Sequence, residues 1–355
     1  MKRRLLLLTA FAAVLPVGAV GATGAAKATG QRRLQAGVVQ AAPYISPAQL
    51  ITSLLQAHFL PAARDFEAAS RTLRDALAKP GQRWKSHRPA WVRAMTRWEI
   101  LNAVAAGPLL ERRSARSIDF WPTRPAQIQM QLAKGVDAMN TLTDMDRIGA
   151  SARGLPALEW LLYKTSGDAT AQRYAVLLAE HVLAEAQTLR EAFEQLAQRE
   201  RDDASAWTLY SEWIGQAMGS LDQLRGKRMQ QPFKDKHSEA WPRATSGQTG
   251  AAWAAQWAGL ERFLMGAPEA RSANAWLPVP GSLNSLLLGR GHLKDSANLK
   301  RLVDGAHAAI ARSASAGPGR ITPTVQALTQ LRTAADSMAS EVLGITLGFT
   351  DADGD

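Results

Sequence analysis

Apolar side chains recur every three or four residues along almost the whole chain, and this spacing limits the fold more than any other feature. The first such series is Leu55, Phe59, Ala62, Phe66, Ala69, Leu73 and Leu77. Residues spaced in this way share one face of an α-helix, so each series predicts a helix with one buried side. Alternating segments long enough to build a β-sheet are absent from the sequence. The sequence therefore predicts an all-α fold.

A change in composition divides this helical pattern into two parts. Residues 47–226 carry several apolar stripes, residues 227–249 are polar, charged and contain proline, and stripes resume over 250–355. Polar stretches with proline are typical of connections between domains. We therefore expect two tandem helical bundles, an N-terminal one over 47–226 and a C-terminal one over 250–355, joined by a linker over 227–249.

The beginning of the chain has the pattern of an export signal. Basic residues at positions 2–4 precede an apolar run over residues 5–20, and small residues follow. This order predicts a signal peptide over residues 1–28, followed by a flexible leader over residues 29–46 that is rich in Gly, Ala, Pro and Gln. The apolar run contains Pro16 and has no basic stop-transfer segment after it. We expect no stable transmembrane anchor after cleavage.

Cysteine content and charge narrow the class of protein further. The 355 residues include no cysteine, so we expect neither disulfides nor a lipoprotein, and an exported chain of this kind is expected in the periplasm. The formal net charge is +11, but no run of five or more basic residues occurs, and arginines are interleaved with acidic residues. This pattern favours a solvated basic surface, and we expect no nucleic-acid partner.

The stretch ARGLPALEWLLY, residues 152–163, places one carboxylate in apolar helical surroundings. Pro156 suits the first turn of a helix, so we expect a helix to begin there and to turn Glu159 toward the core. A buried carboxylate without a partner is costly, and Glu159 therefore needs a cation, hydrogen-bond donors or a shared proton. Two interpretations stay open: a role for Glu159 in a cleft as a ligand, an anion-repelling gate or a general base, or a structural tie to Arg153 or to backbone donors.

Three stretches taken together resemble the imelysin family of exported bacterial proteins, also called insulin-cleaving membrane protease-like. They are GPLLERRSARSIDFWPTR at 107–124, ARGLPALEWLL at 152–162 and LGFTDADGD at 347–355. The resemblance extends from about residue 47 to the end of the chain. It implies an all-helical protein of two bundles, with the functional site near their interface and an association with bacterial iron uptake.

At the second stretch the family pattern is GxHxxE, and this chain departs from it at one position. Gly154 and Glu159 match, whereas Pro156 occupies the place of the histidine. A histidine and a glutamate three residues apart emerge on one helix face and can share a cation, but proline has no lone pair to offer. The chain is similar to a variant branch that keeps the glutamate without the histidine. The resemblance leaves Glu159 as the metal-ligand candidate, for iron or another divalent metal.

Asp119 and Trp121 lie in the first of the three stretches, between large apolar side chains. Asp119 alone is typical of an N-cap or a turn acceptor, with a direct site role as the alternative. The candidate ligand-binding residues are Glu159, Gly154, Pro156, Arg153, Asp119 and Trp121. Glu99 and the neighbouring tryptophans are expected in the core, with their polar atoms hydrogen-bonded.

The sequence lacks the common hydrolase motifs that would indicate an enzyme. The sequence contains no H-E-x-x-H, H-x-x-E-H or G-x-S-x-G, so no catalytic residue is assigned. His181 and Glu185 have a chelating spacing, which is more typical of a surface contact. We expect a periplasmic binding or accessory protein linked to iron uptake, with membrane components of that system as partners. A metal-dependent peptidase and a non-catalytic interaction scaffold are the alternatives.

Overall fold

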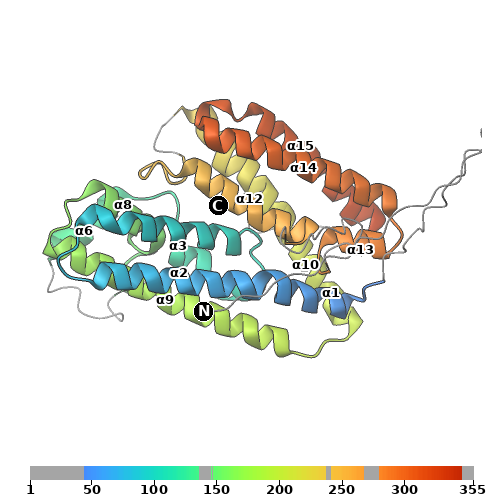
Figure 1. Cartoon of the computed structure of the whole chain (residues 1–355), viewed down its shortest axis with the longest axis horizontal. Coiled ribbons are helices and arrows are strands. Elements are labelled where there is room, and N and C mark those ends of the chain that lie inside the picture. Colours follow the sequence, from blue (N-terminus) through green and yellow to red (C-terminus); the bar gives the residue numbers. More distant parts are fainter. Residues whose placement is uncertain (1–43, 136–144, 146, 237–240, 268–279, 346–355) are drawn as a thin grey trace, which may run out of the picture. The chain divides into compact units, whose positions relative to one another are not determined.

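The computed structural model describes residues 44–135, 145, 147–236, 241–267 and 280–345 (Figure 1). The regular structure in these ranges is helical and includes no strand, which confirms the predicted all-α class. The first half contains α1 (Pro47–Leu54), η1 (Leu55–Phe59), α2 (Leu60–Ala78), η2 (Trp84–His87), α3 (Arg88–Leu101), α4 (Pro108–Glu111), α5 (Ser114–Ile118), α6 (Pro125–Ala133), η4 (Ala150–Ala152), α8 (Gly154–Lys164) and α9 (Ala169–Gln198). The second half contains α10 (Asp203–Asp222), η5 (Gln223–Gln230), α11 (Gln231–Asp235), α12 (Thr249–Met265), α13 (Leu283–Gly289), α14 (Leu293–Ala316), η8 (Pro318–Arg320), α15 (Thr322–Ser337) and η9 (Met338–Val342).

Helices α2, α3 and α9 lie side by side and form the centre of the first bundle (Figure 1). The apolar stripe predicted from Leu55 to Leu77 is buried along its whole length, with no member more than 8% exposed. Phe59 stacks on Phe193 of α9 with ring centroids 5.3 Å apart. Burial of this stripe is the main source of stability for a helix of this kind, because isolated helices are marginal in water.

A π-helical turn, η1, ends two residues before Pro61. The backbone N–H of Leu60 donates to the carbonyl oxygen of Leu55, five residues earlier. Pro61 has no N–H and its ring crowds the carbonyl one turn back, so the turn before it is widened rather than broken. The chain therefore runs as one helical rod from α1 into α2.

Helices α12, α14 and α15 form the second bundle, and α12 also packs against α3 of the first (Figure 1). Two glycines allow these close approaches. A Cβ atom at Gly250 would lie 2.3 Å from the Ala314 carbonyl oxygen, and one at Gly259 would lie 2.3 Å from the Ile100 carbonyl oxygen. Helix α12 therefore meets α14 at backbone distance near its N-terminal end, and meets α3 at Gly259, beside the residue that follows Glu99. The prediction of tandem bundles is confirmed.

The residues expected as a linker, 227–249, are more ordered than their composition suggests. Segment η5 continues α10 as a π-helix as far as Gln230, α11 follows, and residues 241–247 form turns directly before α12. Arg243, in these turns, is only 3% exposed. The polar composition of this segment reflects buried ionic contacts and not a flexible linker. The domain boundaries at 226 and 250 remain a prediction.

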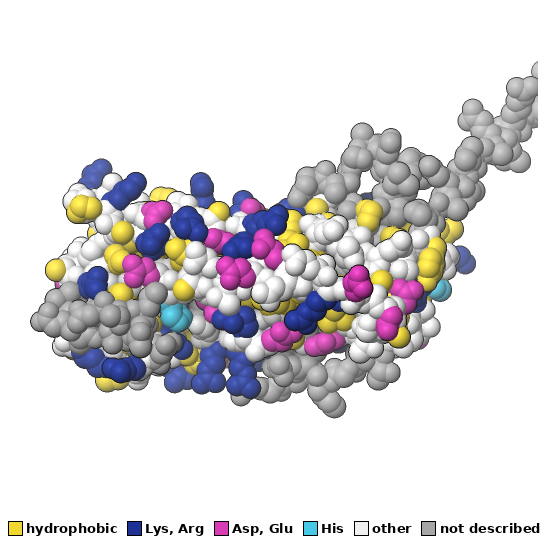
Figure 2. Space-filling view, turned by 90° about the horizontal axis from the view of Figure 1, so that it is seen from below, with side chains coloured by type: hydrophobic (Ala, Val, Ile, Leu, Met, Phe, Trp, Pro, Cys, Tyr) yellow, Lys and Arg dark blue, Asp and Glu magenta, His cyan; other side chains and the backbone are white. Residues whose placement is uncertain are grey.

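The surface seen in Figure 2 mixes both signs of charge. An ion-pair network also joins α2 and α9, in which Arg190 contacts Glu67 at 2.6 Å and Glu194 at 2.5 Å. These side chains are partly exposed, and ion pairs near the surface contribute little individually to stability. In the described ranges no helix is both long and apolar enough to cross a bilayer. The expected signal peptide, most of the expected leader and the closing motif at 347–355 lie outside the described residues.

Candidate functional site

The first two motifs of the sequence meet at Gly154. Helix α8 begins at this glycine, two residues before the expected start at Pro156, which lies buried in the first turn. Gly154 has φ +72°, and a Cβ atom there would lie 2.1 Å from the carbonyl oxygen of Ile118. Only glycine permits both the left-handed backbone and this contact. The start of α8 is thereby held against the backbone that leads into Asp119.

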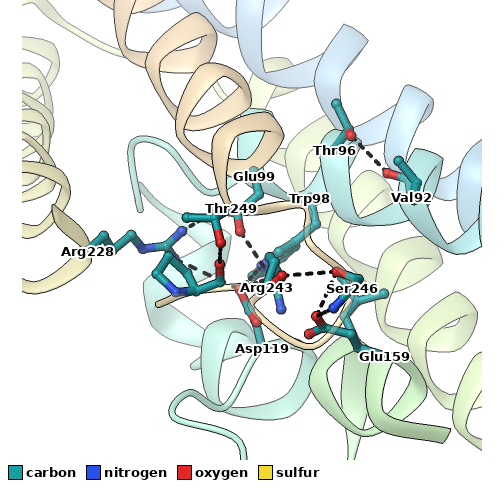
Figure 3. Close-up of polar contacts among 12 residues, drawn as sticks. Val92, Thr96, Trp98, Glu99, Asp119, Glu159, Arg228, Arg243, Ser246 and Thr249 are labelled. Atoms are coloured by element: carbon teal, nitrogen blue, oxygen red, sulfur yellow. Dashed lines mark hydrogen bonds and ion pairs between the residues drawn. The ribbon is translucent and has the colours of Figure 1, made fainter. Parts of the chain in front are cut away.

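Glu159 lies in the second turn of α8 and is 3% exposed, as its apolar surroundings predicted. Its Oε1 atom accepts hydrogen bonds from the backbone N–H of Ser246 at 2.8 Å and from the Ser246 hydroxyl at 2.7 Å (Figure 3). Arg153 instead donates through Nη1 to the Met145 carbonyl oxygen at 3.1 Å. Glu159 is therefore tied to a loop 87 residues away in the sequence, and not to Arg153.

Asp119 follows α5 instead of preceding a helix, so the N-cap interpretation is wrong. Its side chain is 4% exposed. The Oδ2 atom accepts hydrogen bonds from Trp98 Nε1 at 3.0 Å and from Arg243 Nη2 at 2.8 Å. The Oδ1 atom is buried and has no hydrogen-bond partner in the described part of the chain. Trp98 is thus both a core residue and a hydrogen-bond donor to this carboxylate.

Two arginines connect Asp119 to a third carboxylate, Glu99 of α3 (Figure 3). Arg228 Nη1 donates to Glu99 Oε2 at 2.6 Å, and Arg243 Nη2 donates to Glu99 Oε1 at 3.0 Å. The Glu99 and Arg243 side chains are each 2% exposed. The five ionisable residues gathered here, which we call the inter-bundle cluster, are Glu99, Asp119, Glu159, Arg228 and Arg243.

Unusual backbone conformations coincide with this cluster. Arg243 has φ +58°, in the left-handed region that side chains rarely adopt, and Gly247 four residues later has φ +71°. Arg228 projects from the π-helical segment η5. Thr249 Oγ1 donates to the Pro242 carbonyl oxygen at 2.7 Å and holds the loop to the start of α12. Strained and π-helical backbone persists where the surrounding contacts impose it, and it is concentrated at functional sites.

Burial and neighbouring charges act on the protonation of the cluster. Burial raises the pKa of Glu159, and the negative charge of Asp119 adds to this rise, whereas Arg243 and the Ser246 hydrogen bonds oppose it. For Arg243, burial alone would lower the pKa, but the charges of Asp119, Glu99 and Glu159 outweigh it and the pKa lies above its ordinary value. Arg243 is therefore a permanent cation, while Glu159 resists ionisation.

We expect Glu159→Gln to be more stable than the wild type at pH 8, and the difference to shrink toward pH 5. A carboxyl group whose pKa is raised by folding binds its proton more tightly in the native state, so the wild type loses stability as pH rises from the unfolded pKa through the folded one. Glutamine does not ionise and keeps an oxygen acceptor for Ser246. Urea denaturation of both proteins at pH 5 and pH 8 measures this, and a variant that is less stable at both values would contradict it.

The sequence found part of this cluster. Glu159 and Asp119 belong to it, and Gly154 lies against the backbone before Asp119. Pro156 is buried in the first turn of α8, and Trp121 is half-buried, but neither takes part in the contacts described above. Three participants were missed: Arg228, Arg243 and Ser246. Glu99 was expected only as a hydrogen-bonded core residue, which it is, and not as part of a site. The usable signal for Arg243 was its position directly after Trp241-Pro242, because a charge beside large apolar residues in a loop suggests burial.

The residues present do not fit a resident metal ion. Among the described residues no three His, Cys, Asp or Glu side chains are placed to bind one ion. Both oxygens of Glu99 accept from arginine, and Glu185, the candidate chelating partner of His181, accepts from Arg112 at 2.7 Å and from Ser114 at 2.7 Å. The metal-ligand role predicted for Glu159 gains no support from this arrangement.

Comparison with known families agrees with the motifs that meet at this cluster. The family model described as Imelysin matches residues 56–344. This chain belongs to the imelysin family. The matched range includes every residue of the inter-bundle cluster, so the cluster lies within the part of the chain that defines an imelysin. No curated protein matches the chain.

Two solved structures share the imelysin fold seen here. An imelysin-like protein from Psychrobacter arcticum 273-4 superposes with a TM-score of 0.69 at 19% identity, over 87% of this chain and 99% of its own. A "putative iron-regulated protein A precursor" from Parabacteroides distasonis ATCC 8503 gives a TM-score of 0.70 at 14% identity, over 84% of this chain and 95% of its own. At these identities the likeness establishes the fold alone.

Proposed function

We propose that this chain is an exported binding or accessory protein of bacterial iron uptake, acting in the periplasm through the inter-bundle cluster. The observation that carries the proposal is the cluster itself. Three carboxylates and two arginines come together from five separate segments of an imelysin fold. Four of these five residues are no more than 4% exposed. Apolar residues of similar volume would hold two bundles together at least as well as buried ion pairs.

Two further observations support the link to iron and to export. One structural neighbour is named as an iron-regulated protein precursor, and the family resemblance of the sequence implies iron uptake. The residues at 1–28 have the charge and hydropathy order of a signal peptide. Membrane components of the uptake system are the partners that this role requires.

The peptidase alternative lacks a chemical centre in the described residues. None of the three carboxylates in the cluster is paired with a histidine, and burial, with the charge of Arg262 added, lowers the pKa of buried His58 to about 3. A general base for peptide hydrolysis needs both reach to the substrate and a pKa near the working pH. The interaction scaffold predicts instead that no single charged residue of the cluster matters for function.

Growth under iron limitation tests the proposal in the bacterium that encodes the chain. A deletion strain should grow more slowly than the parent when iron is chelated, and the wild-type gene should restore growth. Glu159→Gln is the informative variant, because we expect it to fold at least as well as the wild type while altering the cluster. It should fail to restore growth at equal periplasmic protein level, measured by fractionation and immunoblotting.

Asp222→Asn is the matched control. Asp222 pairs with Arg332 on the surface, with 36% of its side chain exposed, so its loss should leave growth unchanged. Full restoration of growth by Glu159→Gln would favour the scaffold. Cleavage of unfolded insulin chains by the purified protein, abolished by a chelator, would favour the peptidase and overturn the proposal.

A further inference from the structure

The buried carboxylates of the inter-bundle cluster raise the question of which cation neutralises them. Glu99 and Asp119 approach one another from different elements, α3 and the end of α5, and each side chain is less than 5% exposed. Buried carboxylates are stable only beside a cation or a dense set of donors. In proteins that cation is either a bound metal or a basic side chain, and the two differ in their distance from the carboxylate oxygens.

Arg243 stands between the two carboxylates. Its Nη2 atom lies 3.0 Å from Glu99 Oε1 and 2.8 Å from Asp119 Oδ2, so one nitrogen bridges both. A metal ion that bridged the same two oxygens would need to lie about 2.0–2.6 Å from each, in the space that this nitrogen fills. The two cations are mutually exclusive at this position.

The backbone of the loop is shaped to deliver this guanidinium. Arg243 adopts φ +58°, which is unfavourable for any residue with a Cβ atom, and its carbonyl oxygen lies 3.1 Å from the Ser246 hydroxyl that also binds Glu159. A left-handed arginine is retained only where its contacts outweigh the strain. The same short loop therefore supplies the cation for Glu99 and Asp119 and the donors for Glu159.

The charge balance of the cluster depends on Arg243. When all five groups are ionised, three carboxylates and two guanidiniums give the cluster one net negative charge. Without Arg243 the net charge would be minus two. Glu99 Oε1 would lose its hydrogen bond, Asp119 Oδ2 would keep only the one from Trp98 Nε1, and Asp119 Oδ1 is already buried and unpartnered in the described part of the chain. Such a set of hard oxygens suits Mn²⁺ or Ca²⁺.

We propose that Arg243 is the resident cation of this site: its guanidinium occupies the position of a divalent metal between Glu99 and Asp119, and the chain is a metal-independent imelysin. This inference goes beyond the proposed role in iron uptake and holds whether or not that role is correct. It assigns Arg243 as the residue that decides whether the cluster accepts a metal.

Arg243→Gln tests the proposal by removing the charge while leaving an amide oxygen nearby. With about 1 mM Mn²⁺ the wild-type full chain should change its melting temperature by less than about 1 °C, whereas the variant should gain about 5 °C. Electron paramagnetic resonance of free Mn²⁺ gives the stoichiometry, with about one ion bound per variant chain and none per wild-type chain expected. Asp119→Asn added to Arg243→Gln should abolish the response.

Arg332→Gln is the matched control, because Arg332 also lies between two carboxylates, Asp222 at 2.9 Å and Asp336 at 3.1 Å, but these are half-exposed. It should show no Mn²⁺ response, since hydrated surface carboxylates bind the ion weakly. If Arg243→Gln does not fold in buffer, its refolding yield with and without Mn²⁺ becomes the measurement, and recovery with the ion supports the proposal. Stoichiometric Mn²⁺ binding to the wild type that is lost in Asp119→Asn would overturn it, as would a variant that neither binds nor responds to Mn²⁺.

Discussion

Replacing Arg243 with methionine should lower the free energy of unfolding by about 3–5 kcal/mol at pH 7. Methionine has a similar length but no charge, so Asp119 would keep only the Trp98 indole at 3.0 Å and Arg228 at 4.0 Å. Removing one partner of a buried ion pair leaves the other charge desolvated and uncompensated, and this is the main cost. Urea denaturation followed by tryptophan fluorescence measures the loss.

Two comparisons show whether the loss arises from the orphaned carboxylates. Arg332→Met removes an arginine whose partner Asp222 is 36% exposed, and it should cost no more than about 1 kcal/mol. Adding Asp119→Asn to Arg243→Met should recover part of the loss, because the asparagine carries no charge. The penalty should also be smaller at pH 4 than at pH 7, since an uncompensated buried carboxylate takes up a proton. Equal losses for Arg243→Met and Arg332→Met would show that the buried pair contributes no more than a surface pair.

The helices were predictable from the sequence because their signal is local. The stripe from Leu55 to Leu77 needs only the helical period to place its members on one face, and all of them are buried in the structure. The start of α8 was predicted within two residues, because proline in a first turn is a local preference too. The helical period does not show which helix packs against which. The contact of α12 with α3 at Gly259 is therefore known only from the structure.

Only some residues of the inter-bundle cluster were predictable from the sequence, and the others were missed for one shared reason. Glu159 stood out because a carboxylate in an apolar stripe needs compensation, and that argument uses neighbours in the sequence. Its actual partner, Ser246, lies 87 residues away, and Arg243 lies 144 residues from Glu99. Both are in a polar, proline-containing stretch whose composition is equally typical of a linker. Sequence showed that a partner was required but not which one, because composition does not distinguish a solvated polar loop from a buried one.

Gly154→Ala is expected to cost about 3 kcal/mol or more, the second large effect of a single substitution in this chain. The added methyl group would lie 2.1 Å from the Ile118 carbonyl oxygen and 2.6 Å from its carbon, both of them backbone atoms that no rotamer change can move. Gly154 also has φ +72°, which alanine adopts only at a cost. Relief of the collision would shift the backbone just before Asp119, so the Trp98 and Arg243 contacts of this carboxylate should weaken as well.

Gly135→Ala separates the two causes, because Gly135 has φ +82° but a Cβ atom added there would meet no atom within 4 Å. Gly135→Ala should lower the free energy of unfolding by about 1 kcal/mol, because only the left-handed backbone conformation is unfavourable there. The excess loss in Gly154→Ala therefore measures the contact between the start of α8 and the residue before Asp119. If the two variants lose the same stability, the contact between Gly154 and Ile118 contributes nothing. The glycine shared with the imelysin pattern is then required only for its left-handed backbone conformation. A larger loss in Gly154→Ala would mean instead that this glycine holds the Asp119 and Glu159 segments in register, which makes it a positioning residue of the cluster.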